Sequence, residues 1–375
     1  MVQKSIPAMV IRGGTSKGIY FKRSDLPADE STWDGILLRV FGSPDSMQID
    51  GIGGSHSTTS KAMIISPSSK ENYDLDYRFA QISVNKNTVD WGGNCGNLTF
   101  GVGVFGVESG MIKTIPSQTT DLILHNENTN STIEQSLYIT QDGSPQYEGD
   151  FTVYGVPGTG SPIRSRFVDP SGSVTNKLFP TGSASEIISV DSIGDVAVSI
   201  VDVTTPCVFV NASDLNVSAA ITPEKINGDL DLLSVLELIR SIACERAGIV
   251  DDFQNATSHS PGFPKVAIVG SPCDYTTLSG RKIASNEYDI LARIMSMQKA
   301  HPAYAVTGAM CTASAALLEG TIPNQALSST HIGDSVILGH PKGTMRIGVA
   351  IDSNEIIHTE ADRTSRTIMK GSLFY

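Results

Sequence analysis

The sequence lacks the marks of a disulfide framework, a secretory leader and a membrane span. Its five cysteines are widely spaced and form no C-x-x-C pair, so free thiols are expected rather than disulfides or zinc ligands. The N-terminus has no apolar signal core, and no run of about 18 uninterrupted apolar residues occurs. We therefore expect a cytoplasmic protein without a membrane segment.

Positive charge is also scarce. Lys and Arg number 27 against 39 Asp and Glu, which gives a net charge of -12. A chain of this sign is repelled by nucleic acids and by anionic membranes, so neither is expected as a partner. The seven histidines show no i, i+4 spacing suited to a metal, and no metal site is predicted.

Short β-type runs dominate the first half of the chain, and helical periodicity appears mainly later. The expected strands lie at 8–14, 18–23, 61–69, 73–84, 120–126 and 135–141, each bounded by Gly, Pro, Asn or Asp. The expected helices lie at 31–42, 231–249 and 286–300. This mixture predicts an α+β protein.

A faint internal repeat suggests two halves. Cys95 follows a strand-like segment at 87–93 and precedes a run of small residues at 96–107, while Cys311 stands between similar segments at 303–310 and 312–320. Each thiol would precede a tightly packed central helix, although chance can also produce this pattern. The segment 154–182, rich in Pro, Gly and Ser, is interpreted as the passage between the halves.

Two glycine motifs resemble nucleotide-binding loops without their context. "GVGVFG" at 101–106 satisfies G-x-G-x-x-G, but its flanks do not indicate a βαβ unit. "GGTSKG" at 13–18 has its Lys after its Ser and its first Gly misplaced for a P-loop. No nucleotide cofactor is predicted.

Cys95 and Lys61 are the candidates for chemistry. At a helix N-terminus the dipole favours the thiolate form of Cys95, and the amides of Gly96 and Asn97 are suited to a carboxylate or an enolate oxyanion. The alternative is a buried structural cysteine. Lys61 begins the apolar strand "KAMIIS", where partial desolvation would favour the neutral amine of a general base. The alternative is a solvated lysine at a strand edge.

Several motifs together resemble the PrpF-type isomerases, a family that includes 2-methylaconitate, 3-methylitaconate and aconitate isomerases and 4-oxalomesaconate tautomerase. They are "IRGGTSKGIYF", "FGSPDSMQIDGIGG", "TSKAMIIS", "VDWGGNCGNLTFGVGVF", "DPSGSVTNKLFPTG", "HPAYAVTGAMCTA" and "LEGTIPN", in the family's order from about residue 7 to residue 371. The resemblance implies a diaminopimelate epimerase-like fold of two pseudo-symmetric, barrel-like halves, each around a central helix. We expect the halves at 1–185 and 186–375, and the last strand can return to the first half.

The resemblance also implies an activity and a set of site residues. The expected reaction is an allylic proton shift or cis-trans isomerisation on an unsaturated di- or tricarboxylate, without a cofactor. Lys61 and Cys95 correspond to the family's catalytic residues. The expected substrate-binding residues are Ser16, Ser60, Asn94, Gly96, Asn97, Cys311, His340 and Lys342.

Departures from the family pattern bear on the substrate. Lys342 stands in "GHPKG" where the family often has "GHPSG", and an added ammonium would favour a tricarboxylate unless it points to solvent. The other departures are "TTPC" where the family often has "NP", and Asn176 where it often has Gly.

Two other functions stay open at this point: a two-cysteine amino-acid racemase that uses Cys95 and Cys311, and a non-catalytic protein that binds polycarboxylates. A small polycarboxylate is the expected partner, and a homodimer is left open.

Overall fold

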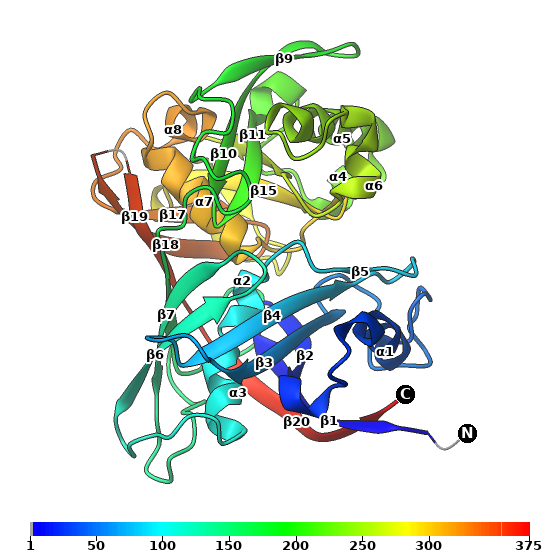
Figure 1. Cartoon of the computed structure of the whole chain (residues 1–375). Coiled ribbons are helices and arrows are strands. Elements are labelled where there is room, and N and C mark those ends of the chain that lie inside the picture. The colour runs from blue at the N-terminus through cyan, green and yellow to red at the C-terminus, as the bar shows by residue number, and fades with distance from the viewer. Residues whose placement is uncertain (1–2, 354) are drawn as a thin grey trace. The chain divides into compact units, whose positions relative to one another are not determined.

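The computed structural model describes residues 3–353 and 355–375. The chain forms two compact units, Met1–Arg166 together with Asp362–Tyr375, and Phe167–Ala361. The last strand, β20 (Ser365–Phe374), pairs antiparallel with β1 (Ser5–Gly13), as the red and blue ribbons of Figure 1 show. The predicted boundary at residue 185 stays a prediction.

The first unit is a mixed sheet with helices on both faces. Its strands pair in the order β20-β1-β2-β3-β4-β6-β7, with parallel steps at β2–β3 and β4–β6. Besides β1 and β20, its elements are β2 (Ser16–Lys22), α1 (Trp33–Phe41), β3 (Lys61–Pro67), β4 (Leu75–Ile82), β5 (Val89–Asp90), α2 (Gly96–Thr99), α3 (Val102–Glu108), β6 (Thr119–Asn126), β7 (Ser131–Tyr138) and β8 (Ile163–Val168), which runs into the second unit.

Alternation along β3 decides which side of the sheet Lys61 faces. Ala62 and Ile64 lie in the core cluster with Trp33 and Leu37 of α1. Successive side chains of a strand point to opposite faces, so Lys61 faces the other side, where α2 and α3 contact β1, β2 and β3. Lys61 and the helix that follows Cys95 are therefore on the same face of the sheet.

The second unit is built from a similar sheet. Its strands pair in the order β9-β10-β11-β12-β15-β17-β18-β19, with parallel steps at β11–β12 and β15–β17. Its elements are β9 (Glu186–Val190), β10 (Gly194–Val203), β11 (Thr205–Asn211), α4 (Pro223–Gly228), α5 (Leu230–Arg246), α6 (Ala256–His259), β12 (Lys265–Gly270), β13 (Tyr275–Thr276), β14 (Lys282–Ile283), β15 (Ile290–Ser296), β16 (Lys299–Ala300), α7 (Val306–Leu317), α8 (Ile322–Ala326), β17 (Ser335–His340), β18 (Gly343–Asp352) and β19 (Glu355–Arg363).

The two units repeat one topology. In the first, the run β1-β2-β3-β4-β6-β7 alternates antiparallel and parallel pairings, and the run β10-β11-β12-β15-β17-β18 of the second does the same. The helices α1 and α5 occupy equivalent places in the chain order, as do α2–α3 and α7. The α+β fold with two pseudo-symmetric halves, each with a central helix, is confirmed.

Two sequence predictions in the second unit are wrong. The segment 286–300 is not a helix, because β15 lies between β12 and β17 and is buried on both faces, so its apolar residues follow burial rather than helical period. The segment 303–310 is not a strand, since most of it belongs to α7. Cys311 therefore lies inside its helix, whereas Cys95 is the N-cap of α2.

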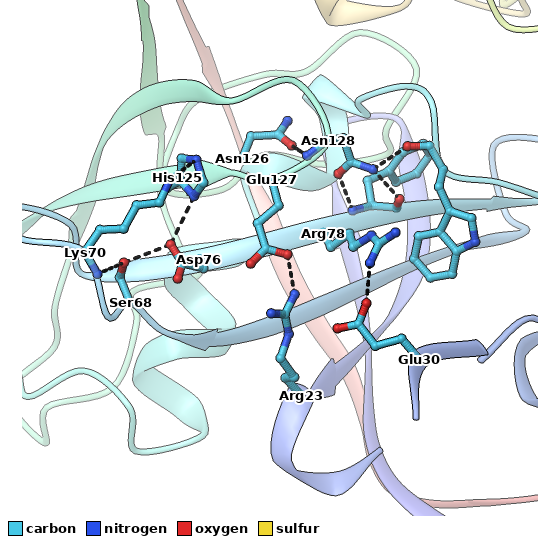
Figure 2. Close-up of polar contacts among 12 residues, drawn as sticks. Arg23, Glu30, Ser68, Lys70, Asp76, Arg78, His125, Asn126, Glu127 and Asn128 are labelled. Atoms are coloured by element: carbon cyan, nitrogen blue, oxygen red, sulfur yellow. Dashed lines mark hydrogen bonds and ion pairs between the residues drawn. The ribbon is translucent and has the colours of Figure 1, made fainter. Parts of the chain in front are cut away.

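A polar cluster on the first unit's sheet holds several charged groups in mutual contacts (Figure 2). His125 lies between Lys70 and Asp76, with its Nε2 2.9 Å from the Lys70 Nζ and its Nδ1 3.1 Å from the Asp76 Oδ1. Arg23 pairs with Glu127, and Arg78 with Glu30. These groups are therefore already engaged with one another.

Over the described ranges, no three His, Cys, Asp or Glu side chains gather as a metal ion would need. No helix in that part of the chain has both the length and the apolarity to cross a membrane.

Candidate active site

Three segments of the first unit meet at the start of β2 and β3. The turn before β2 contacts Asn97, since the Thr15 amide donates to the Asn97 Oδ1 and the Asn97 Nδ2 donates to the Thr15 Oγ1, both at 3.2 Å. The Lys17 amide donates to the Thr58 carbonyl at 3.0 Å, which joins the same turn to the segment before Lys61. The loops around residues 16, 60 and 97 therefore lie side by side in the first unit.

Two glycines make this convergence possible. Gly14 has a φ of +48°, and a Cβ there would lie 2.1 Å from the Asn97 Oδ1. A Cβ at Gly18 would lie 2.5 Å from the Leu98 Cδ1 and 3.0 Å from the Lys61 carbonyl oxygen. Helix α2 and strand β3 thus approach β2 from two sides at a position that tolerates no side chain.

Lys61 is the first residue of β3 and is half-buried. Its Nζ donates to the Gln81 Oε1 at 2.5 Å and lies 5.0 Å from the centre of the Phe79 ring. The amine is thus held at the end of the strand by one neutral acceptor and one aromatic face. This position, neither solvated nor sealed, suits a group that exchanges protons with a ligand.

Cys95 is the N-cap of α2 and is 8% exposed, and its carbonyl accepts a hydrogen bond from the Thr99 amide at 3.0 Å. Cys95 interacts electrostatically with two buried phenols, Tyr20 and Tyr77. Burial raises the pKa of Tyr20 well above its usual value, and Cys95 and Tyr77 add to the shift while Arg12 opposes it. Burial also raises the pKa of Tyr77, with a smaller contribution from Cys95.

Both phenols are therefore neutral at physiological pH. The Tyr20 hydroxyl donates to the Leu98 carbonyl at 2.6 Å, and the Tyr77 hydroxyl lies 3.2 Å from the Thr99 Oγ1. These contacts hold the single turn of α2 against the sheet and thereby fix the position of Cys95 at its N-terminus.

The predicted binding residues of the first unit differ in what they offer. Ser60 is fully buried, and its hydroxyl donates to the Gln48 Oε1 at 2.7 Å, so it shapes the loop. Asn97 is committed to Thr15, and Ser16 and Gly96 are buried. Asn94 is half-buried, and its Oδ1 is enclosed with no hydrogen-bond partner among the described residues.

The other three predicted binding residues, Cys311, His340 and Lys342, belong to the second unit. Cys311 is 0% exposed, its thiol donates to the Val201 carbonyl at 3.3 Å, and burial raises its pKa well above the usual value. The expectation that it lines the site is not supported by this placement. The N-cap of α7, equivalent to Cys95, is Ala305, so the second half has no thiol there.

His340 and Lys342 stand where β17 turns into β18. His340 is buried, and its Nδ1 accepts a hydrogen bond from the Lys342 amide at 3.2 Å, which fixes the turn. The Lys342 side chain is half-buried. The structure thus assigns His340 a part in forming the loop that carries Lys342.

Sequence reasoning missed two glutamines. Gln81 accepts from Lys61, and Gln48 accepts from Ser60 and from the Ser55 amide. Gln48 lies within the quoted motif "FGSPDSMQIDGIGG", but no role was assigned to it, and Gln81 lies outside the quoted motifs. The signal available for Gln81 was its place between Ala80 and Ile82, at the apolar end of a predicted strand.

The comparisons with known proteins identify the family of the chain. The chain matches the family model described as PrpF protein over residues 3–375. It is 42% identical to the 3-methylitaconate isomerase of Eubacterium barkeri over 99% of this chain and 97% of that protein. It is 37% identical to the 2-methyl-aconitate isomerase of Shewanella oneidensis over 98% and 96% of the two chains.

Solved structures lead to the same family. A crystal structure of methylitaconate-delta-isomerase has a TM-score of 0.83 and 41% identity, covering 99% of this chain and 96% of that one. A hydroxyproline epimerase from Agrobacterium vitis shares the fold alone, with a TM-score of 0.55 and 11% identity over 99% and 92% of the chains. The chain described here therefore belongs to the PrpF family.

Proposed function

We propose that this protein is an isomerase that moves a proton along an unsaturated di- or tricarboxylate, with Lys61 as the base and Cys95 as the acid. The observation that carries the proposal is the convergence of the Gly13–Ser16 turn, the start of β3 and the N-terminus of α2 on one face of one sheet. The methylitaconate and methyl-aconitate isomerases named above support this substrate class.

The proposed reaction begins at the carbon next to the C=C bond. The neutral Lys61 amine takes a proton from that carbon, and the electron pair of the broken C–H bond spreads through the allylic system into a carboxylate. The Cys95 thiol then gives its proton to the far carbon, which shifts the double bond. Lys61 returns its proton to solvent and Cys95 regains one before the next turnover.

Stabilising the dienolate is the main energetic task, because its charge appears on a carboxylate oxygen. The amides of Gly96 and Asn97, in the single turn of α2, have no intrahelical acceptor and would donate to this oxygen. Gly96 leaves room for an oxyanion to approach them. Rotation within the delocalised intermediate would also allow cis-trans isomerisation.

Lys342 is relevant to the number of carboxylates on the substrate. It is half-buried on a loop fixed by His340, and an ammonium there would pair with an extra carboxylate. Were this ammonium to meet the substrate, a tricarboxylate of the aconitate type would be the preferred acid. Cytoplasmic location and a homodimer stay predictions.

An amino-acid racemase with two thiols is disfavoured. Such an enzyme needs a second thiol facing the first across its substrate, and Ala305 stands at the position equivalent to Cys95. The thiol of Cys311 is instead engaged with the Val201 carbonyl in the core of its unit.

The test is to incubate the protein with cis-aconitate, 2-methylaconitate, itaconate and methylitaconate in deuterium oxide and to follow the vinyl and methylene signals by NMR. Lys61→Ala is expected to abolish exchange in whichever acid reacts. Lys22→Ala is the matched control, because Lys22 is also half-buried in this sheet and donates to the Ser109 carbonyl at 2.8 Å. Loss of the α-proton of proline or diaminopimelate instead would favour the racemase.

A further inference from the structure

Gln81 is joined to the proposed base across the sheet. Lys61 and Gln81 are directly opposite one another in the antiparallel pair β3–β4, and their side chains meet at 2.5 Å. Gln81 is 8% exposed, so little water competes for its oxygen. Side chains directly opposite on one face of such a pair are the closest neighbours that a strand residue has.

The orientation of the Gln81 amide is fixed by its other contacts. Its Nε2 donates to the Ser60 carbonyl at 2.9 Å and to the Ser57 carbonyl at 3.2 Å. Since carbonyl oxygens only accept, the amide nitrogen must face them, and the amide oxygen must then face Lys61.

The same network continues behind the loop. The Ser60 hydroxyl donates to the Gln48 Oε1 at 2.7 Å, and the Gln48 Nε2 donates to the Ser43 hydroxyl at 2.9 Å. The carbonyls that orient Gln81 are therefore themselves held in place. A chain of neutral hydrogen bonds fixes the point from which Lys61 acts.

An uncharged acceptor has a chemical advantage here. Both the neutral amine and the ammonium of a lysine carry N–H donors, so an amide oxygen can hold the side chain throughout a proton-transfer cycle. A carboxylate at the same place would favour the ammonium and oppose return to the free base. An apolar side chain would leave the amine free to rotate away.

We infer that Gln81 is a positioning residue of the reaction: it holds the Lys61 amine at the reacting carbon in both of its protonation states. The inference rests on the proposed function, because Gln81 acts only through Lys61. It assigns to Gln81 a kinetic effect separate from any contribution to folding.

The experiment compares Gln81→Met, Gln81→Glu and Gln135→Met with the unchanged protein, by steady-state kinetics from pH 6 to pH 10 and by thermal unfolding. Gln135→Met is the matched control, because Gln135 is a buried glutamine of the same unit whose side chain bonds the Gly103 amide and the Thr99 carbonyl at 2.9 and 3.0 Å. Both Met variants lose buried hydrogen bonds, but only one loses a contact with the base.

Gln81→Met is expected to lower kcat about 100-fold with KM changed less than about threefold, as for a misplaced catalytic group. Gln81→Glu is expected to move the limb of the pH–rate profile that reports the free base upward by about one to three pH units. Gln135→Met is expected to lower the unfolding temperature and to leave the limb of the pH–rate profile that reports the free base where it is in the unchanged protein.

A folded Gln81→Met variant with unchanged kcat would overturn the positioning role, and an unshifted Gln81→Glu profile would overturn the role in both protonation states. Lys61→Ala in the same assay separates this inference from the proposed function. If Lys61→Ala remained active, the proposed base would be wrong. If it were inactive while Gln81→Met retained full activity, only the inference about Gln81 would fail.

Discussion

Replacing Gly14 by alanine should damage the candidate site more than any glycine change of the same backbone type elsewhere. Gly14 has a φ of +48°, and an added Cβ would lie 2.1 Å from the Asn97 Oδ1. The methyl group must therefore displace the Asn97 amide, which breaks both of its hydrogen bonds to Thr15. The turn before β2 and the N-terminus of α2 would then separate.

The magnitude has two parts. A left-handed conformation costs an alanine roughly 1–2 kcal/mol. Two lost hydrogen bonds in a partly buried site cost about 1 kcal/mol each. We expect Gly14→Ala to lower the free energy of unfolding by about 3 kcal/mol.

Gly110→Ala isolates the first part, because Gly110 has a φ of +75° and a Cβ there would have no neighbour within 4 Å. That control is expected to cost only about 1–2 kcal/mol in urea unfolding, and to leave turnover unchanged. Gly14→Ala should also raise KM. Equal stability and equal KM in the two variants would refute the argument that Gly14 exists to admit Asn97.

Three further predictions follow from individual side chains. In iodoacetamide labelling read by mass spectrometry, exposed Cys273 should react first, Cys95 more slowly, and fully buried Cys311 only on unfolding. A bound polycarboxylate should protect Cys95, and protection of Cys273 instead would contradict the proposed site. Lys342→Ser should lower kcat/KM for a tricarboxylate relative to a dicarboxylate by about tenfold, and an unchanged ratio would show that Lys342 does not bind substrate. Burial raises the pKa of Tyr275 to about 12, so the stability that its neutral phenol contributes is complete below about pH 10, where the unfolded phenol ionises, and is lost as the pH rises towards 12. In urea unfolding from pH 9 to pH 11, the free energy of unfolding should therefore fall less in Tyr275→Phe than in the unchanged protein.

Much of the first unit could be predicted from local patterns. The runs at 8–14, 61–69 and 120–126 became β1, β3 and β6, because alternating side chains and bounding turn residues act over a few neighbours. The helix at 31–42 became α1, which begins and ends within the predicted range. The PrpF family, the isomerase class and the fold, which the motifs implied, are confirmed by the comparisons.

What failed depended on contacts between distant segments. The segment 286–300 has helical spacing, yet its pairing with β12 and β17 makes residues 290–296 a strand. Cys311 resembled Cys95 in its flanks, but α7 begins at Val306, before the thiol, and this places the sulfur in the core. Gln81 was missed because only the register of β3 with β4 brings it to Lys61.

The most direct test separates exchange from isomerisation in Cys95→Ser. In deuterium oxide, this variant should still incorporate solvent deuterium at the carbon that Lys61 deprotonates, but should form product at least about 100-fold more slowly than the unchanged protein. Product formation at the unchanged rate by a folded Cys95→Ser variant would contradict the account, because Cys95 would then not deliver the second proton.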